Sequence, residues 1–410
     1  MAEESGNMFG SRFTGTDPYD FDHWYPLLRD LTFETECIPV TLAEGVAMKQ
    51  RCSEHQQRGQ LLRWGANAAE LQPLVIPPGL SSLTERIDQV LKGTGEGTGG
   101  GFVRLSNRSP KDAVFSSPCF APVLEAEIAR SFLGPDAPEA LQVASDMVAF
   151  VRASCLANRV NSGAEAMELL CSSQRILADL TRTLLVAEDD QQPTSSSTSL
   201  PAPSSTSEVD SPGEKAVMLP VSCVVRRWYH KIAPEYEFRV FVVAKRVVAI
   251  TQYYKLAYVQ QIAQEVQRIK EQIIRYIAEQ VSPRLPALDV YTADLVFDPE
   301  DLESIKLIEI NNPPPLAGQA LFSWDDPADR AVLSGKAEGC EIRVLLTPPD
   351  PQVSLSQVYQ PLLPLFNTLR ENRNPSKPQQ SVSSPSSQHG GSSSFLGFFK
   401  KKKKDGKGKR

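Results

Sequence analysis

Runs of β-branched and aromatic residues predict six strands in the second half of the chain. They are residues 223–228, 237–243, 246–252, 290–297, 305–310 and 341–346. The first three runs predict a meander whose last turn is Ala244-Lys245, and the next two predict a hairpin with its turn near Asp301. The end of segment 17–40 and the apolar residues around Arg104 predict two further short strands.

Apolar residues three and four positions apart predict helices between and around these strands. A helix is expected from Ser82, which opens a Ser-Leu-Thr-Glu capping box. Segment 137–186 predicts two helices separated near residues 161–163, and segment 256–281 predicts one amphipathic helix over a face of the sheet. A short helix is expected within residues 354–369. The pattern as a whole predicts an α+β fold.

Three segments are predicted to be disordered because their composition provides too little apolar area to offset the entropy of ordering. They are the N-terminus, residues 1–16, an insertion rich in Ser, Thr and Pro, residues 188–217, and a Ser/Pro-rich and polybasic tail, residues 373–410. Residues 17–372 are expected to form one domain around the insertion.

Charge is distributed unevenly along the chain. The formal net charge is -6, although the last eleven residues hold eight basic side chains and one acidic one. The acidic remainder is unsuited to binding nucleic acid over a broad surface. In the tail, the aromatic run 395–399 meets five lysines, a combination that fits contact with anionic lipid or acidic partners, a nuclear import signal, or a solvated tail.

Cysteine usage and hydropathy indicate the compartment. The seven cysteines include no C-x-x-C pair, which favours reduced thiols over disulfides or a zinc site. No apolar run approaches the roughly 20 residues that cross a bilayer, and the first ten residues lack the apolar core of a signal peptide. We expect a soluble, cytoplasmic monomer without a transmembrane segment.

The predicted hairpin carries the clearest candidate chemistry. Asp294 is expected opposite Glu309, with Asp298 closer to the turn and Asn311 two residues beyond Glu309. Carboxylate and amide oxygens in such a cluster suit a hard cation, and Mg²⁺ commonly binds carboxylates together with phosphates. The alternative is that these acids only solvate one face of the sheet.

Other candidate residues have equally open interpretations. Glu237 and Arg239 are expected on one face of a largely apolar strand, where they pair with each other or with a ligand. Trp228 and Tyr229 either flank a base or fill the core. After Arg104, a basic and hydroxyl-rich turn could hold polyphosphate or be ordinary surface. Its polar residues are Asn107, Arg108, Ser109, Lys111 and Asp112.

Six blocks, in order between residues 21 and 324, resemble the cell division cycle protein 123 family, an ATP-grasp family of eukaryotic assembly factors. They are FDHWYPLLRDLT, FVRLSNRSPKDA, VVRRWYHKIAPEYEFRVFV, TADLVFD, LIEINNP and ALFSW. The resemblance implies an ATP-grasp-like fold, in which antiparallel and mixed sheets with flanking helices form two lobes around a nucleotide cleft.

The resemblance also implies ATP and Mg²⁺ as cofactors. Arg104 stands at a phosphate-contacting position, and Glu237 and Arg239 face ribose and phosphate. The implied adenine edge comprises Arg227, Trp228 and Tyr229. The implied Mg²⁺ ligands are Asp298, Glu309 and Asn311, with Asp294 as a further candidate. The sequence departs from the family at four places: Arg104 replaces Lys, Tyr253 replaces Arg, Glu309 replaces Asp, and Asn312-Pro313 replaces Pro-Phe.

Family members are chaperones that bind the free gamma subunit of eukaryotic translation initiation factor 2 and allow its trimer to assemble. The resemblance therefore implies an ATP-Mg²⁺-binding assembly chaperone with that gamma subunit as its partner. Two alternatives remain open from the sequence: a carboxylate-amine ligase, and a degenerate scaffold that binds no nucleotide.

Overall fold

The computed structural model describes residues 17–63, 75–93, 99–117, 119–190, 216–356 and 362–372. Contact density separates a compact unit, residues 1–373, from residues 374–410, and every described residue belongs to the first unit. Residues 1–16 and 373–410, predicted to be disordered, lie outside the described residues, as does most of the predicted insertion, residues 191–215.

A three-stranded antiparallel sheet has the order β1-β3-β2. Its strands are β1 (Thr35–Thr41), β2 (Gly101–Leu105) and β3 (Met218–Arg227). The predicted meander is wrong in one respect, because residues 223–227 belong to β3 and pair with β1 and β2. These partners come from far earlier in the chain, and local alternation of residues carries no information about such pairings.

A five-stranded sheet has the order β7-β6-β4-β5-β8. Its strands are β4 (Glu237–Val243), β5 (Arg246–Gln252), β6 (Val290–Asp298), β7 (Asp301–Asn311) and β8 (Glu341–Arg343). The turn at Ala244-Lys245 is confirmed, and both residues have positive φ, as a tight hairpin turn requires. The second hairpin is also confirmed, and its turn lies between Asp298 and Asp301.

The predicted strand 341–346 is shorter in the structure. Strand β8 pairs in parallel with β5 over only three residues, Glu341 to Arg343. Two residues later, the backbone N–H of Leu345 donates to the side-chain oxygen of Gln252, at 3.3 Å, and not to a strand carbonyl. A side-chain acceptor therefore takes the position of the next ladder hydrogen bond.

Four helices pack around the three-stranded sheet. They are α3 (Leu42–Arg63), α4 (Ser81–Gly93), α7 (Gly163–Ser172) and α8 (Gln174–Asp190). Their apolar residues share one core with Val103, Val221 and Cys223 of the sheet. Helix α3 is not predicted by its sequence, because its few apolar residues follow no single face. The predicted second helix of segment 137–186 is two helices, since Ser173 has an extended backbone between α7 and α8.

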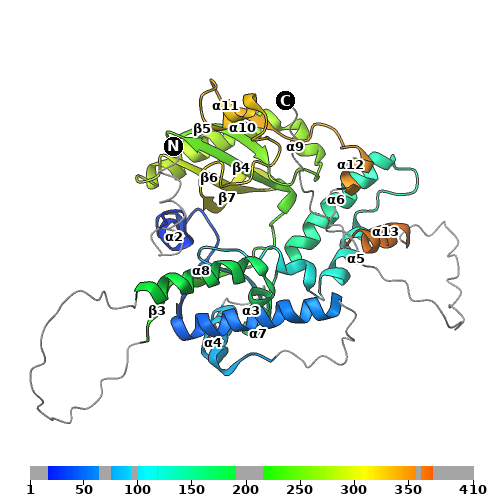
Figure 1. Ribbon diagram of the computed structural model, residues 1–410. Coiled ribbons are helices and arrows are strands. Elements are labelled where there is room, and N and C mark those ends of the chain that lie inside the picture. Colours follow the sequence, from blue (N-terminus) through cyan, green and yellow to red (C-terminus); the bar gives the residue numbers. More distant parts are fainter. Residues whose placement is uncertain are drawn as a thin grey trace, which may run out of the picture. The chain divides into compact units, whose positions relative to one another are not determined.

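The amphipathic segment 256–281 covers one face of the five-stranded sheet, as predicted (Figure 1). It is divided into α9 (Gln260–Gln264), α10 (Val266–Tyr276) and a π-helical turn (Ile277–Val281). Ile269, Ile273 and Ile277 pack in one core with Phe238 and Leu295 of the sheet. Helix α2 (Phe21–Leu28) adds Trp24, only 2% exposed, to this core.

The remaining helices complete the described chain. They are α5 (Phe120–Arg130), α6 (Glu139–Leu156), α11 (Pro327–Leu333), α12 (Pro351–Ser356), α13 (Leu363–Asn372) and 3₁₀ turns at Pro78–Leu80, Ala113–Ser116, Pro234–Tyr236 and Ser282–Arg284. Phe366 of α13 packs into the core of α5 and α6. In the described part of the chain, no helix is long and apolar enough to cross a membrane. The mixed α+β class with antiparallel and mixed sheets is confirmed.

Candidate functional site

A row of polar residues crosses the five-stranded sheet on the face opposite α10. Arg239 of β4 is the direct neighbour of Asp294 on β6, and Asp294 is the neighbour of Glu309 on β7. The alternation predicted for β4 is confirmed, because Phe238 and Val240 join the core with α10. Arg239 is therefore held on the other face by the strand geometry itself.

The Asp294 carboxylate is fully buried and lies between two donors. Arg239 donates to both of its oxygens, with Nε···Oδ1 and Nη2···Oδ2 distances of 2.8 Å, and the Asn311 amide donates to Oδ2 at 3.0 Å. Burial raises the pKa of Asp294, although the charge of Arg239 opposes the shift. The third guanidinium nitrogen used by Arg239 donates to the Gly318 carbonyl at 2.8 Å.

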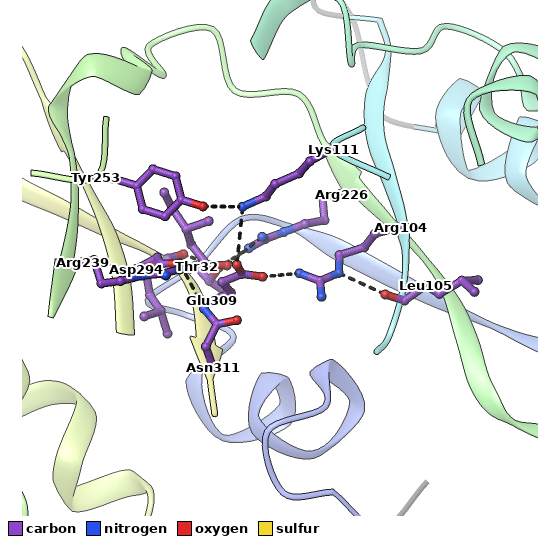
Figure 2. A network of polar contacts seen from close by, with 12 residues as sticks. Thr32, Arg104, Leu105, Lys111, Arg226, Arg239, Tyr253, Asp294, Glu309 and Asn311 are labelled. Atoms are coloured by element: carbon purple, nitrogen blue, oxygen red, sulfur yellow. Dashed lines mark hydrogen bonds and ion pairs between the residues drawn. The ribbon is translucent and has the colours of Figure 1, made fainter. Parts of the chain in front are cut away.

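Two cations approach the Glu309 carboxylate, one from strand β2 of the other sheet and one from the turn after β2 (Figure 2). Arg104 of β2 donates to one oxygen of its carboxylate, and the Lys111 ammonium lies 3.8 Å from the other. Burial alone would raise the pKa of Glu309, but the charges of Arg104 and Lys111 outweigh burial and lower it. Residues of the two sheets thus meet at one carboxylate.

Tyr253 lies between two cations. Its hydroxyl accepts a hydrogen bond from Lys111 at 3.0 Å, and the guanidinium of Arg239 lies 4.8 Å from the ring centroid. Burial would lower the pKa of Lys111, but Tyr253, Glu309 and nearby acids raise it. Tyr253 therefore provides an aromatic surface and a hydroxyl between two positive charges.

Glu237 is buried at the first position of β4. Its side chain lies on the same face of the strand as that of Arg239, and Glu237 is only 7% exposed. Burial raises the pKa of Glu237 to about 8, because Lys111 and Arg239 offset only part of the desolvation. A Glu237–Arg239 pair, one of the expected alternatives, does not form, since Arg239 is bound to Asp294.

A second group of predicted residues lies elsewhere. Trp228, Tyr229 and Asp298 line a pocket of about 370 Å³, together with Lys231. Asp298 accepts a hydrogen bond from Lys231 at 3.4 Å. The extra residues at both irregularities of this hairpin are on β7, and β6 has none between Asp294 and Asp298. Four residues of strand separate the two Cα atoms by about 13 Å, so Asp298 lies too far along β6 to join the cluster.

The remaining predicted residues are Arg227, Asn107, Ser109 and Asp112. Arg227 forms an ion pair of 2.8 Å with Glu34, which is largely exposed. In the turn after β2, Asn107 and Ser109 are both buried, and the Ser109 hydroxyl has no hydrogen-bond partner in the described structure. Asp112 of the same turn accepts hydrogen bonds from Ser173 and from the backbone of Gln174, so it fixes the start of α8.

The donor set suits a hard cation but is smaller than the sequence predicts. Within the described residues, no three His, Cys, Asp or Glu side chains are grouped to hold a metal ion. Asp294 and Glu309 provide two carboxylates, and Asn311 lies within hydrogen-bond distance of Asp294. Two carboxylates and an amide oxygen match what Mg²⁺ takes from a protein when phosphates and waters complete its shell.

The sequence singles out neither Arg226 nor Arg175 as a site residue. It places Lys111 in a basic turn that could hold polyphosphate or be ordinary surface. Arg226 of β3 is buried, donates to the Ile308 carbonyl at 2.7 Å and lies 4.9 Å from the ring centroid of Phe33. Arg175, on the first turn of α8, is close enough to Glu309 for their charges to interact. The positions of these three cations depend on contacts between distant segments of the chain. The only local signal for them is a basic residue next to an apolar strand.

Comparison with protein families decides the classification. The model of the D123 family matches residues 150–365, more than half of the 410 residues. The chain belongs to the D123 family. This membership confirms the predicted relationship to cell division cycle protein 123. The D123 match contains Arg239, Asp294, Glu309 and Asn311, whereas Arg104 precedes it.

Two solved structures are similar to this D123-family chain. Cdc123 from Schizosaccharomyces pombe is 17% identical, with a TM-score of 0.48, and the match covers 80% of this chain and 94% of that one. A C-terminally truncated Cdc123 from the same organism is 18% identical, with a TM-score of 0.47 and coverages of 81% and 95%. No curated protein sequence matches the chain significantly.

Proposed function

We propose that this D123-family protein binds ATP with Mg²⁺ in an ATP-grasp-like cleft between its two sheets. The observation that supports the proposal is the meeting of Arg104 and Lys111, from the three-stranded sheet and its following turn, with Glu309 of the five-stranded sheet. Arg239, Asp294 and Asn311 continue this cluster. Cations that bind phosphate beside carboxylates that bind a metal are the requirements of a Mg²⁺-nucleotide site.

In this proposal each group has a distinct role. Arg104, Lys111 and Arg239 bind phosphate oxygens, and Asp294, Glu309 and Asn311 hold Mg²⁺. The geometry favours Asp294 over Asp298 as a metal ligand, because Asp298 is paired with Lys231 in the other pocket. Trp228 and Tyr229 line that pocket, whose apolar and aromatic walls suit the base. Glu237, Tyr253, Asn107 and Ser109 complete the proposed surroundings of ribose and phosphate.

A calorimetric titration tests nucleotide binding directly. ATP should bind the full-length protein more tightly with Mg²⁺ than with EDTA, and Glu309→Gln should remove most of that difference. Asp298→Asn is the matched control, because it changes a carboxylate on the same hairpin outside the cluster. Absence of ATP binding to the wild type would refute the proposal. A loss of Mg²⁺ dependence in Asp298→Asn alone would place the metal at the other pocket.

We further propose that the protein is a cytoplasmic assembly chaperone that binds the free gamma subunit of eukaryotic translation initiation factor 2. Membership of the D123 family supports this role. Nucleotide should strengthen the interaction, since a ligand bound by both sheets orders the surface between them. The test is a pull-down of purified gamma subunit with ATP-Mg²⁺ and with EDTA. Equal recovery in both, or none in either, would count against the proposal.

One further measurement separates this role from that of a carboxylate-amine ligase. A ligase supplied with ATP, amino acids and amines releases ADP continuously, whereas a chaperone that uses nucleotide for ordering does not. We expect no steady ADP release in the presence of candidate amino acids. Continuous release that depends on an added amino acid would favour the ligase.

A further inference from the structure

Arg175 lies on the first turn of α8, beside the turn that carries Lys111. Its backbone N–H donates to the Asp112 carboxylate at 3.3 Å, and the neighbouring Ser173 hydroxyl donates to the other oxygen of that carboxylate. Asp112 directly follows Lys111, whose ammonium reaches Tyr253 at 3.0 Å and Glu309 at 3.8 Å. One carboxylate therefore fixes the start of α8 next to the cationic part of the site.

Arg175 differs from the neighbouring arginines in the contacts that its side chain makes. Its side chain is half-buried, and within the described residues its guanidinium forms no hydrogen bond or ion pair. Other arginines nearby are paired: Arg104 with Glu309, Arg108 with Asp179, and Arg239 with Asp294. A half-buried cation without a counterion is costly, and an anionic ligand would remove that cost.

The charges that act on Arg175 include groups of the cluster around Glu309. Burial lowers its pKa, the charge of Arg108 adds to that effect, and Asp112, Glu309 and Tyr253 act in the opposite direction. Arg175 is thus within electrostatic range of Glu309 and Tyr253. The pocket at Trp228 and Tyr229, proposed for the base, is lined by other residues.

We propose that Arg175 binds the phosphate chain of the nucleotide at the end held by the metal. The inference rests on the proposed function and adds a residue that the family resemblance does not assign. Arginine suits this position because its planar fork can donate two parallel hydrogen bonds to one phosphate. It supplements Arg104 and Lys111, which already neutralise Glu309 and therefore have less charge available for a ligand.

The test compares Arg175→Gln with Arg182→Gln. Arg182 is on the same helix, is largely exposed and pairs with Asp179 at 3.6 Å, so it controls for a lost charge on α8. Calorimetry would use three probes with Mg²⁺: ATP, inorganic tripolyphosphate and adenosine. We expect Arg175→Gln to weaken ATP and tripolyphosphate by about tenfold to a hundredfold, as loss of charged hydrogen bonds does, and to leave adenosine unchanged. Arg182→Gln should stay within about twofold of the wild type.

The outcomes separate this inference from the proposed function. If the wild type binds ATP and Arg175→Gln binds it equally well, the role of Arg175 is refuted and the nucleotide site stands. If the wild type binds neither ATP nor tripolyphosphate, both fail. Should Arg175→Gln lose affinity for all three probes and also melt earlier without ligand, its role is structural and the inference fails. Arg175→Lys, which keeps the charge, should recover part of the affinity for tripolyphosphate.

Discussion

Arg239 and Asp294 are direct neighbours across β4 and β6, and two hydrogen bonds of 2.8 Å join their side chains. Asp294→Asn would leave the buried guanidinium of Arg239 without its carboxylate. Because an uncompensated buried charge is costly, we expect the free energy of unfolding to fall by about 3–5 kcal/mol in urea denaturation. Asp30→Asn is the control, since it breaks an exposed pair of 2.6 Å with Arg284 and should change little. Equal losses in the two variants would contradict the expectation.

Glu237 should make stability depend on pH near neutrality. Burial raises its pKa to about 8 from an ordinary value of 4.5. Above the ordinary value, the unfolded chain loses a proton that the folded protein keeps, so rising pH favours unfolding until the folded pKa is passed. Between about pH 5 and about pH 8, the wild type should lose stability relative to Glu237→Gln, by a few kcal/mol at most.

Urea denaturation at several pH values would measure this dependence. Glu300→Gln, which changes a carboxylate that is 82% exposed, should follow the wild-type profile. If Glu237→Gln also runs parallel to the wild type across the whole range, Glu237 is ionised in the folded protein and the expectation is wrong.

The stability that Arg104 contributes should increase with pH, whereas the Glu237 carboxyl makes the wild type less stable as pH rises. Arg104 and Lys111 lower the pKa of Glu309, so the ionised carboxylate contributes stability above its ordinary value of 4.5, and this contribution is lost as pH falls through the folded pKa. The difference in unfolding free energy between wild type and Arg104→Met should therefore be largest above about pH 5 and shrink in acid. Arg227→Met, which loses a pair with the exposed Glu34, should give a small difference. A constant gap for Arg104→Met would indicate a packing effect alone.

Two glycines give a matched test of helix packing. A Cβ on Gly163, at the start of α7, would lie 2.0 Å from the backbone oxygen of Thr84 on α4, so Gly163→Ala must displace one helix. Within α3, a Cβ on Gly59 would meet no atom within 4 Å. Thermal denaturation should show a clear loss of stability for Gly163→Ala and a gain of about 0.5–1 kcal/mol for Gly59→Ala. Similar melting temperatures for the two variants would show that α4 and α7 adjust freely.

The sequence was most informative where chemistry follows from local alternation. The pairing of Asp294 with Glu309 and the common face of Glu237 and Arg239 follow from the two-residue period of a strand, and both predictions concern single hairpins or single strands. The α+β class follows from the same periodicities. In these places, side-chain direction is fixed by neighbours in the chain.

Other features depend on long-range contacts and could not be predicted. The assignment of residues 223–227 to a separate sheet depends on partners at residues 35–41 and 101–105. The pairing of Asp298 depends on Lys231, which lies far earlier in the chain and donates to its carboxylate at 3.4 Å. Helix α3 lacks a continuous apolar face, so its packing with α7 and α8, and not its periodicity, marks it as a helix.

The two oxygens of Glu309, each approached by a cation from beyond its own sheet, have a consequence for how a ligand enters. A metal ion would have to compete with an ammonium and a guanidinium, and phosphates would have to attract those same groups away from the carboxylate. Entry into the proposed site would thus be an exchange of counterions, and either component alone would gain little binding free energy. Magnesium and nucleotide should arrive as one chelate, and their joint affinity should greatly exceed what their separate affinities suggest.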